Sequence, residues 1–278
     1  MSNPYEARLL RVMEFIHDNP DGDLSLDALA DVAAMSRFHW HRVFHGMTGE
    51  TCAGAVRRIR MHRAACWLVQ KDWSVPDVAS RCGYDNAASF ARVFREAFDL
   101  TPAAFRARGA LMSPQSQTKK GNQAMYPVEI KTRPEGRLAA LAHKGPYMEI
   151  GKKFEALAAM FSSRGLWPSA HGMAGVYYDD PNAVDEAELR SHAGILVGVD
   201  FVMPDDIEDL SITPGKVAVM TFKGPYSGLK AGYDYLYGVW LPESGEEPRD
   251  APAMEIYLND PTDTAPEDLV TEVCLPLK

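Results

Sequence analysis

The segment DVASRCGYDNAASFARVFREAFDLTPAAFR (residues 77–106) decides the fold of the first half of the chain. Residues 75–82 are expected to form one helix, and Gly83 permits the turn that follows it. Asp85 or Asn86 can cap a second helix. The apolar positions of that helix recur at helical spacing and form its core face: Phe90, Val93, Phe94 and Ala97. Helix, turn and helix together predict a helix-turn-helix unit.

The same design occurs earlier in the chain. RVFHGMTGETCAGA (42–55) is similar in composition and position to RVFREAFDLTPAAF (92–105). Residues 26–33 place apolar side chains along one helical stripe, and Ser36 can cap a helix that begins at Arg37. The core face of that helix is expected to hold Trp40, Val43, Phe44 and Met47. The chain therefore contains two predicted helix-turn-helix units.

The outward faces of the two second helices suit a DNA groove. Arg can donate two hydrogen bonds to guanine, and an exposed aromatic edge can pack against a thymine methyl group. Small residues let a helix N-terminus approach the anionic backbone. A connecting helix over 53–70 would hold the units about one DNA turn, roughly 34 Å, apart. The candidate DNA-binding residues are Arg37, Phe38, His41, Arg42, His45, Asn86, Ala87, Ala88, Ser89 and Arg92.

Residues 8–108 resemble the DNA-binding domain of the AraC/XylS family of transcription regulators. The resemblance is carried by the first helix-turn-helix, by RIRMHRAACWLV (58–69) and above all by residues 77–106. Asp99 departs from the glycine that many members have there, but Asp tolerates a left-handed backbone. The resemblance implies an all-α domain that binds double-stranded DNA, with base reading by Phe38, His41 and Arg42. The alternative is a helical bundle whose exposed Arg and His side chains are only solvated.

Charge is distributed unevenly along the chain. The net charge is -9, yet residues 1–112 hold 14 Lys and Arg against 13 Asp and Glu, which leaves 15 against 25 for the remainder. Partners of opposite charge are therefore plausible for the two halves. Between them, SPQSQTKKGNQ (113–123) is polar and aperiodic, as a flexible linker is. We expect a DNA-binding domain over 1–112, a linker over 113–124 and a second domain over 125–278.

Several functional classes are disfavoured by the sequence. The start of the chain, MSNPYEARLL, has no signal-peptide pattern, and no run approaches the roughly 18 apolar residues of a membrane span. We expect a cytoplasmic protein with no membrane partner. The cysteines lack CxxC spacing, and a helix would place His39 away from His41 and His45. We therefore expect reduced thiols, no metal site and no cofactor.

The second half contains a duplication. LAHKGPYMEI (141–150) matches MTFKGPYSGL (220–229), and GVYYDDP (175–181) matches EIYLNDP (255–261). An apolar run follows each copy of the second motif. The pattern predicts an α+β domain in which each copy has the order strand, strand, helix, strand, strand. Helices are expected near 147–163 and 226–240. Two such copies should pair about a pseudo-twofold axis, with a ligand pocket at their junction.

Glu255 breaks the symmetry of this duplication, because its counterpart is Gly175. Strand alternation places Glu255 and Tyr257 on one face, and Met254, Ile256 and Leu258 on the other. A carboxylate among aromatic rings binds organic cations well. The alternatives are a solvent-facing Glu255 and aromatic residues that belong to the core, and Tyr233 is a further aromatic nearby. The candidate ligand-binding residues are Glu255, Tyr257, Tyr147, Trp167, Tyr177, Tyr226 and Trp240.

Residues 126–278 resemble the GyrI-like effector-binding domain through the two KGPY motifs and the MEIYLNDP run. By that resemblance Glu255 corresponds to the family's pocket glutamate, which implies a bulky, apolar and often cationic small-molecule effector. A DNA-binding domain followed by a GyrI-like domain is the order of the Rob type of AraC regulator.

Three functions are consistent with the second half. In the leading hypothesis, a bound ligand changes DNA affinity or contact with RNA polymerase, for which a coupling of about 1–3 kcal/mol suffices. In the second, the domain is a hydrolase with Glu255 as general base, although His143 and His192 are the only partners the sequence offers. In the third, the domain mediates partner binding or homodimer formation without a ligand.

Overall fold

The computed structural model describes residues 4–108, 125–261 and 263–278. Contacts group the chain into two compact units, Met1–Met35 with Thr48–Gly121 and Ser36–Met47 with Asn122–Lys278. The expected linker, residues 113–124, lies outside the described residues. Helix α3 (Arg37–Thr48), expected as the second helix of the first helix-turn-helix, is grouped with the second unit over nearly its whole length.

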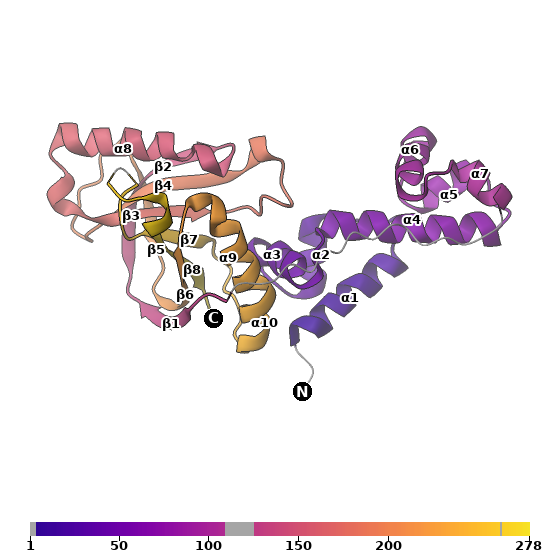
Figure 1. Ribbon diagram of the computed structural model, residues 1–278, viewed down its shortest axis with the longest axis horizontal. Helices are drawn as coiled ribbons and strands as arrows, with labels where there is room; N and C mark the ends of the chain where they lie inside the picture. The colour runs from indigo at the N-terminus through magenta and orange to yellow at the C-terminus, as the bar shows by residue number, and fades with distance from the viewer. Residues whose placement is uncertain (1–3, 109–124, 262) are drawn as a thin grey trace. The chain divides into compact units, whose positions relative to one another are not determined.

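The described part of the first unit is helical (Figure 1). Its helices are α1 (Pro4–Asp18), α2 (Leu26–Ala33), α4 (Cys52–Gln70), α5 (Val75–Arg81), α6 (Ala87–Phe98) and α7 (Pro102–Arg108). The long helix α4 organises the unit, because α1 packs against it and α5, α6 and α7 gather around it. The connecting helix expected over residues 53–70 is thus confirmed, whereas α1 and α7 were not predicted individually.

Helix α6 forms where the sequence predicts it. Of the two candidate caps, Asn86 serves: its Oδ1 accepts hydrogen bonds from the backbone amides of Ala88 at 2.7 Å and Ser89 at 3.4 Å. The buried face of α6 packs on α4 and α7, with rings from Phe90, Phe94, Phe98 and Phe105 in one cluster. Aromatic packing on α4 therefore fixes the second helix-turn-helix and leaves its opposite face to solvent.

The second unit contains one eight-stranded antiparallel sheet in the described residues. Its strands are β1 (Val128–Arg133), β2 (Gly136–Lys144), β3 (Ala170–Tyr177), β4 (Arg190–Val197), β5 (Glu208–Ile212), β6 (Gly215–Lys223), β7 (Ala253–Tyr257) and β8 (Val270–Pro276). The strand order is β1-β6-β8-β7-β3-β4-β2-β5. Counted inward from one edge of the sheet, the strands are β1, β6, β8 and β7, and from the other edge they are β5, β2, β4 and β3. Strands at the same position in these two series are equivalent in the duplication. A pseudo-twofold axis therefore passes between β7 and β3. Each copy also pairs its first strand with the second strand of the other copy.

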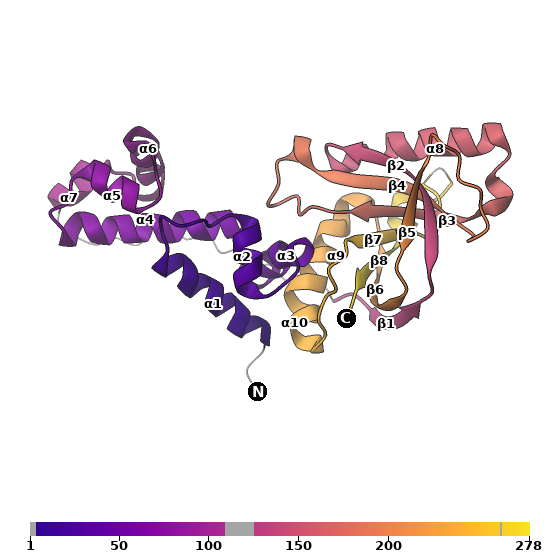
Figure 2. The same cartoon turned by 180° about the vertical axis from the view of Figure 1, so that it is seen from behind.

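One helical segment in each copy covers the sheet (Figure 2). In the first copy, a 3-10 turn at Tyr147–Glu149 leads into α8 (Gly151–Arg164), which packs on β2 and β4. In the second, a 3-10 turn at Tyr226–Gly228 leads into α9 (Leu229–Tyr235), which packs on β6. A π-helical turn (Leu236–Trp240) then joins α9 to α10 (Leu241–Ser244). The duplicated strand, strand, helix, strand, strand order is confirmed.

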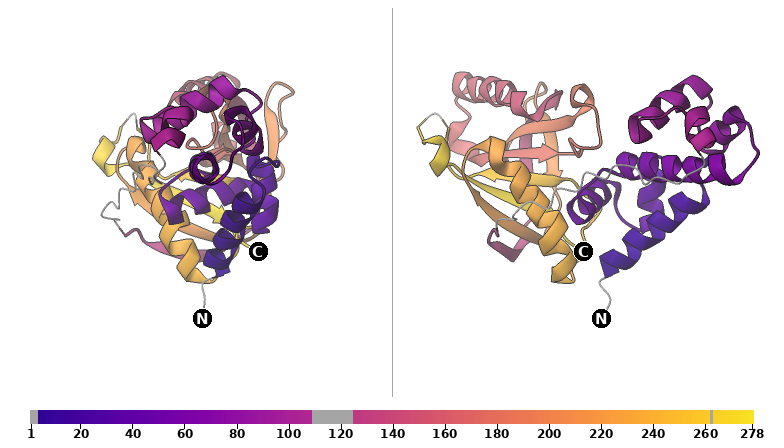
Figure 3. Two further views of the ribbon diagram at one scale, coloured as in Figure 1. Left: turned by 90° about the vertical axis from the view of Figure 1, so that its right-hand side faces the viewer. Right: turned by 45° about the vertical axis from the view of Figure 1, so that its right-hand side comes forward.

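The sheet is curled (Figure 3). Both of its faces bury apolar side chains. Alternation along β2 shows this directly: Ala139 packs with Leu157 and Phe161 of α8, whereas its neighbours Leu138 and Ala140 join a cluster on the other face. That second cluster also contains Met254 and its neighbours from the central strands. Two-sided burial makes the sheet a rigid support for the residues at its pseudo-twofold axis.

Some expectations about side-chain chemistry and membranes can also be compared with the structure. The four cysteines, all of which lie in the described residues, form no disulfide bond with one another; Cys66 is half-buried and the other three are buried. Over the ranges that the structure covers, no helix is long and apolar enough to cross a membrane.

We predict that Asp99→Gly stabilises the protein by about 0.5–1 kcal/mol. Asp99 ends α6 in the left-handed region with φ 57°, and its amide bonds to the Arg95 carbonyl oxygen at 2.8 Å. Glycine adopts this conformation without steric cost, so the bond is kept and the strain is relieved. Urea denaturation measures the change. The control is Ala104→Gly at an exposed position inside α7, which should lower stability; a loss of stability from both changes would contradict the prediction.

Candidate functional site

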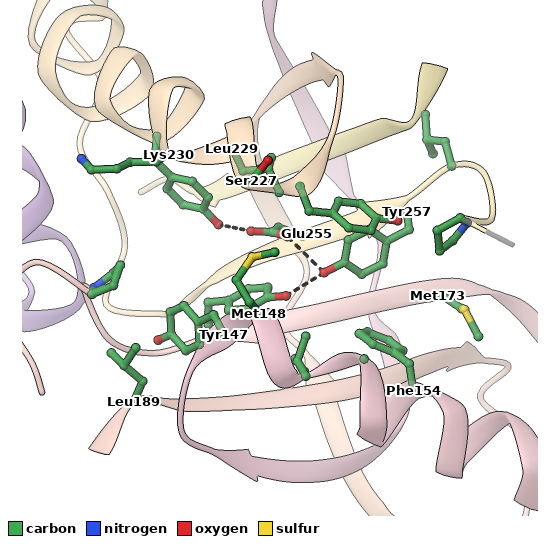
Figure 4. Close-up of a pocket in the computed structure, with 18 of the residues that line it drawn as sticks. Tyr147, Met148, Phe154, Met173, Leu189, Ser227, Leu229, Lys230, Glu255 and Tyr257 are labelled. Carbon is green, nitrogen blue, oxygen red and sulfur yellow. Dashed lines mark hydrogen bonds between the residues drawn. The ribbon is translucent and has the colours of Figure 1, made fainter. Parts of the chain in front are cut away.

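A cavity of about 940 Å³ lies where the two copies meet in the second unit (Figure 4). Both copies supply its walls: Tyr147 and Phe154 come from the first, and Leu229 and Tyr257 from the second. Helix α3 adds Arg42 and His45 to the lining. The cavity therefore occupies the junction at which a ligand pocket was expected.

Glu255 sits on the pseudo-twofold axis of the domain. In the β3–β7 ladder, Glu255 pairs directly with Gly175, its counterpart in the duplication. The equivalent tyrosines Tyr177 and Tyr257 meet across the axis with their hydroxyl oxygens 2.7 Å apart. A Cβ atom at residue 175 would lie 2.9 Å from the Tyr257 hydroxyl oxygen and 3.0 Å from that of Tyr177. Glycine at this position thus makes room for the tyrosine pair that supports the carboxylate.

The Glu255 carboxylate is buried and held by phenols. Glu255 is only 5% exposed. Oε1 accepts a hydrogen bond from Tyr233 at 2.9 Å, and Oε2 accepts one from Tyr257 at 3.0 Å. Burial raises the pKa of Glu255, and the two phenol hydrogen bonds together with the positive charge of Arg42 only partly oppose that rise. The alternative of a solvent-facing Glu255 is therefore excluded.

Aromatic rings surround this carboxylate in contacting pairs that the duplication relates. The rings of Tyr147 and Tyr177 meet edge to face at 4.9 Å, and those of Tyr226 and Tyr257 do so at 5.4 Å. Phe154 packs edge to face on Tyr257 at 5.5 Å. Burial raises the pKa of Tyr147 to about 12, so its phenol is neutral at physiological pH. The wall is a set of neutral rings and hydrogen-bond donors around one carboxylate.

The lining of the cavity is rich in negative charge. Among the described residues that line the cavity, the strongly basic side chains are Arg42 and Lys230. Lys230 forms an ion pair with Asp234 at 2.9 Å. The carboxylates of the lining are Glu155, Asp180, Glu186, Asp234, Glu255 and Asp260. This balance favours cations over anions.

Six of the seven predicted ligand-binding residues line the cavity: Glu255, Tyr257, Tyr147, Trp167, Tyr177 and Tyr226. Trp240 does not, because it lies in the π-helical turn about 10 Å along the helix beyond Tyr233. Tyr233 takes part instead. The counterpart of Tyr233 in the first copy is Phe154, which has no hydroxyl. Tyr233 is therefore a second position at which the two copies differ. Alignment of the two copies in the sequence could have identified it.

The predicted DNA-binding residues fall into two groups. In the first unit, Asn86, Ala88, Ser89 and Arg92 are exposed and Ala87 is half-buried. On α3, Arg37 is exposed, whereas Phe38, His41, Arg42 and His45 are half-buried. The core face of α3 is confirmed at Trp40, Val43 and Phe44, and is only half-buried at Met47.

Sequence reasoning considered His39 only as a metal ligand and missed its structural role; the residue is buried. Its Nε2 lies 2.8 Å from the Arg249 carbonyl oxygen and therefore donates to it. Its Nδ1 then accepts from the Tyr237 hydroxyl at 3.0 Å. Burial lowers the pKa of His39 to about 4, with a smaller contribution from the charge of Arg42. A neutral imidazole with both nitrogens satisfied thus anchors α3 to the second unit.

Comparisons with known proteins agree with this architecture of a helix-turn-helix region and a duplicated pocket domain. The family of GyrI-like small molecule binding domains matches residues 126–278, and a helix-turn-helix domain family matches residues 29–108. The chain belongs to the GyrI-like family and carries an AraC-type helix-turn-helix domain.

Named relatives match one half of the chain or the other. The probable transcription factor PqrA of Proteus vulgaris is 35% identical over 88 residues, which are 32% of this chain and 72% of PqrA. The DNA gyrase inhibitor of Yersinia enterocolitica is 29% identical over 136 residues, 47% of this chain and 85% of that protein. The bifunctional transcriptional activator/DNA repair enzyme AdaA of Bacillus subtilis is 33% identical over 112 residues, 40% of this chain. The match spans about half of AdaA, 51% of its length.

We predict that Glu255→Gln raises the melting temperature of the ligand-free protein at neutral pH. The folded-state pKa of Glu255 is raised, so the folded protein holds its proton more tightly and loses stability as the pH rises above the unfolded-state pKa. An uncharged side chain removes that loss. The gain should therefore vanish below about pH 4, where the carboxyl is protonated in both states.

Thermal denaturation of both proteins across this pH range measures the effect. Glu267→Gln is the control, because Glu267 is an exposed carboxylate of the same unit. A difference in melting temperature that is independent of pH would show that burial of charge is not its cause.

Proposed function

We propose that the chain is a transcription regulator that binds double-stranded DNA through residues 1–112 and a bulky apolar or cationic compound through residues 125–278. The observation that carries the proposal is the buried Glu255 carboxylate, held by phenols on the floor of an aromatic cavity. Regulation through RNA polymerase contact or through homodimer formation belongs to the same proposal, as does action in the cytoplasm.

A cation is the ligand class that this carboxylate favours. A buried carboxylate without a full counter-charge carries a desolvation cost, and a bound cation offsets that cost while water is excluded. Each aromatic ring face adds roughly 0.5–2 kcal/mol for a cation placed over it. Tyr147, Tyr226 and Tyr257 line the same cavity as the Glu255 carboxylate.

The size of the cavity favours a bulky ligand. Its volume of about 940 Å³ lies at the upper end of the roughly 300–1,000 Å³ range of small-molecule sites. Apolar side chains such as Met148, Met173 and Leu258 contribute to the lining, so much of a ligand's surface would contact apolar atoms. Acidic residues in the same lining would draw cations toward the site.

The exposed face of α6 supports the DNA-binding part of the proposal. Ala88 and Ser89 are small and exposed in its first turn, and Arg92 is exposed one turn later. A helix N-terminus with small side chains can approach a phosphate closely, and the arginine can then reach the same backbone or a base edge. We propose that Phe38, His41 and Arg42 on α3 supply the base contacts of the first helix-turn-helix.

We predict that Glu255→Gln weakens binding of tetraphenylphosphonium by about tenfold or more, since roughly 1.4 kcal/mol of charge compensation is lost. The measurement is isothermal titration calorimetry on the full chain. Neutral triphenylphosphine oxide serves as the matched ligand, and its affinity should change less than about twofold. Equal losses for the two compounds would show that Glu255 only supports the cavity wall.

We predict that Arg92→Ala weakens DNA binding by roughly 1 kcal/mol or more and reduces the salt dependence of binding by about one counterion. A duplex selected from random-sequence DNA and fluorescence anisotropy at several salt concentrations provide the test. Lys144→Ala, an exposed basic residue of the second unit, is the control. Unchanged affinity and salt dependence for Arg92→Ala would remove α6 from the interface.

A further inference from the structure

Arg42 of α3 places a positive charge in the lining of the cavity. Its guanidinium lies over the ring of Tyr233, 4.3 Å from the centroid, and 5.4 Å from that of Tyr237. Nη2 donates a hydrogen bond to the Asp179 carbonyl oxygen at 3.0 Å. Tyr233 is the same side chain that donates to Glu255. The Arg42 guanidinium thus makes the kind of contact with aromatic rings that a cationic ligand would make in this cavity.

The backbone of α3 is fitted closely to the second unit. Gly46 of α3 and Gly238 of the π-helical turn meet without side chains between them. A Cβ atom at residue 238 would lie 2.5 Å from the Gly46 carbonyl oxygen, and one at residue 46 would lie 2.5 Å from the Gly238 Cα. His39 with its two hydrogen bonds, and Ser36, which donates to Asp250 at 2.6 Å, extend the contact toward the start of the helix.

This contact uses the face of α3 that DNA would need. His39, Arg42 and Gly46 recur at helical spacing and form one stripe against the second unit. Arg42 and His45 are also among the predicted DNA-binding residues, and both line the cavity. A major groove cannot enclose the same side chains while they are docked.

We propose that α3 is an internal, autoinhibitory occupant of the effector cavity, and that an organic cation displaces Arg42 and thereby frees α3 for DNA. The inference rests on the proposed function and names its regulation. The cation and the docked Arg42 compete for the ring of Tyr233, whose hydroxyl donates to Glu255. DNA and the second unit compete for α3. Cation and DNA binding therefore strengthen each other, and by linkage to the same extent.

Gly238→Ala tests the inference without altering a residue that contacts the ligand or is predicted to contact DNA. The added methyl group meets backbone atoms of Gly46, which cannot rotate away, so the docked position of α3 is lost. Alanine also favours a helical backbone more than glycine does. The matched control is Gly198→Ala in the same unit, where the nearest neighbour of the added methyl group is 3.8 Å away.

The experiment compares full-length wild type, Gly238→Ala and Gly198→Ala. Affinity for one selected duplex is measured by fluorescence anisotropy at fixed salt, with and without tetraphenylphosphonium, and affinity for tetraphenylphosphonium by calorimetry. In wild type and in Gly198→Ala, we expect the cation to raise DNA affinity about tenfold. In Gly238→Ala, we expect DNA to bind about tenfold more tightly without the cation, the cation to add less than twofold, and the cation itself to bind more tightly.

The outcomes separate this inference from the proposed function. Equal DNA affinity for wild type and Gly238→Ala, with cation binding intact in both, would overturn autoinhibition and leave the two binding functions standing. Absence of DNA binding in all three proteins would overturn the proposed function itself. If Gly238→Ala fails to fold, Tyr237→Phe replaces it, because loss of the hydroxyl leaves buried His39 without its donor and weakens docking in the same direction.

Discussion

The rest of the second unit depends on one constraint, the burial of the Glu255 carboxylate without a full counter-charge. Two phenols hydrogen-bond to it, and burial still raises its pKa. Phenols are neutral donors, so they orient the carboxylate but do not cancel its charge. A site of this kind binds most strongly whatever supplies a desolvated positive group, whether that group comes from a ligand or from Arg42 of the same chain.

The duplication explains how such a site is built on a stable sheet. Equivalent strands form a two-sided core, and equivalent tyrosines meet at the axis. Binding chemistry is then confined to positions at which the copies differ. Glu255 carries a charge, whereas its counterpart Gly175 leaves space for the tyrosine pair. Tyr233 donates a hydrogen bond through its hydroxyl, which its counterpart Phe154 lacks. Symmetry therefore maintains the fold, and its local breaks create the cavity.

Periodicity and repetition in the sequence predicted the helix-turn-helix elements, the duplicated domain and the position of Glu255, because these features depend on local pattern. The position of α3 did not follow from pattern, since its contact with the second unit depends on two glycines far apart in sequence whose backbones happen to meet. His39 was missed because a buried histidine looks like any polar helix residue until its partners are known. Trp240 was misplaced because the π-helical turn could not be anticipated.

A crystal structure of the full chain with bound tetraphenylphosphonium tests the account most directly. The account predicts the cation beside the Glu255 carboxylate, within about 6 Å of the centroids of the surrounding tyrosine rings, with the Arg42 guanidinium no longer over Tyr233. A cation bound outside the cavity would contradict the central claim that Glu255 defines a cation site. A cation inside the cavity with Arg42 still stacked on Tyr233 would contradict the claim that ligand and helix compete.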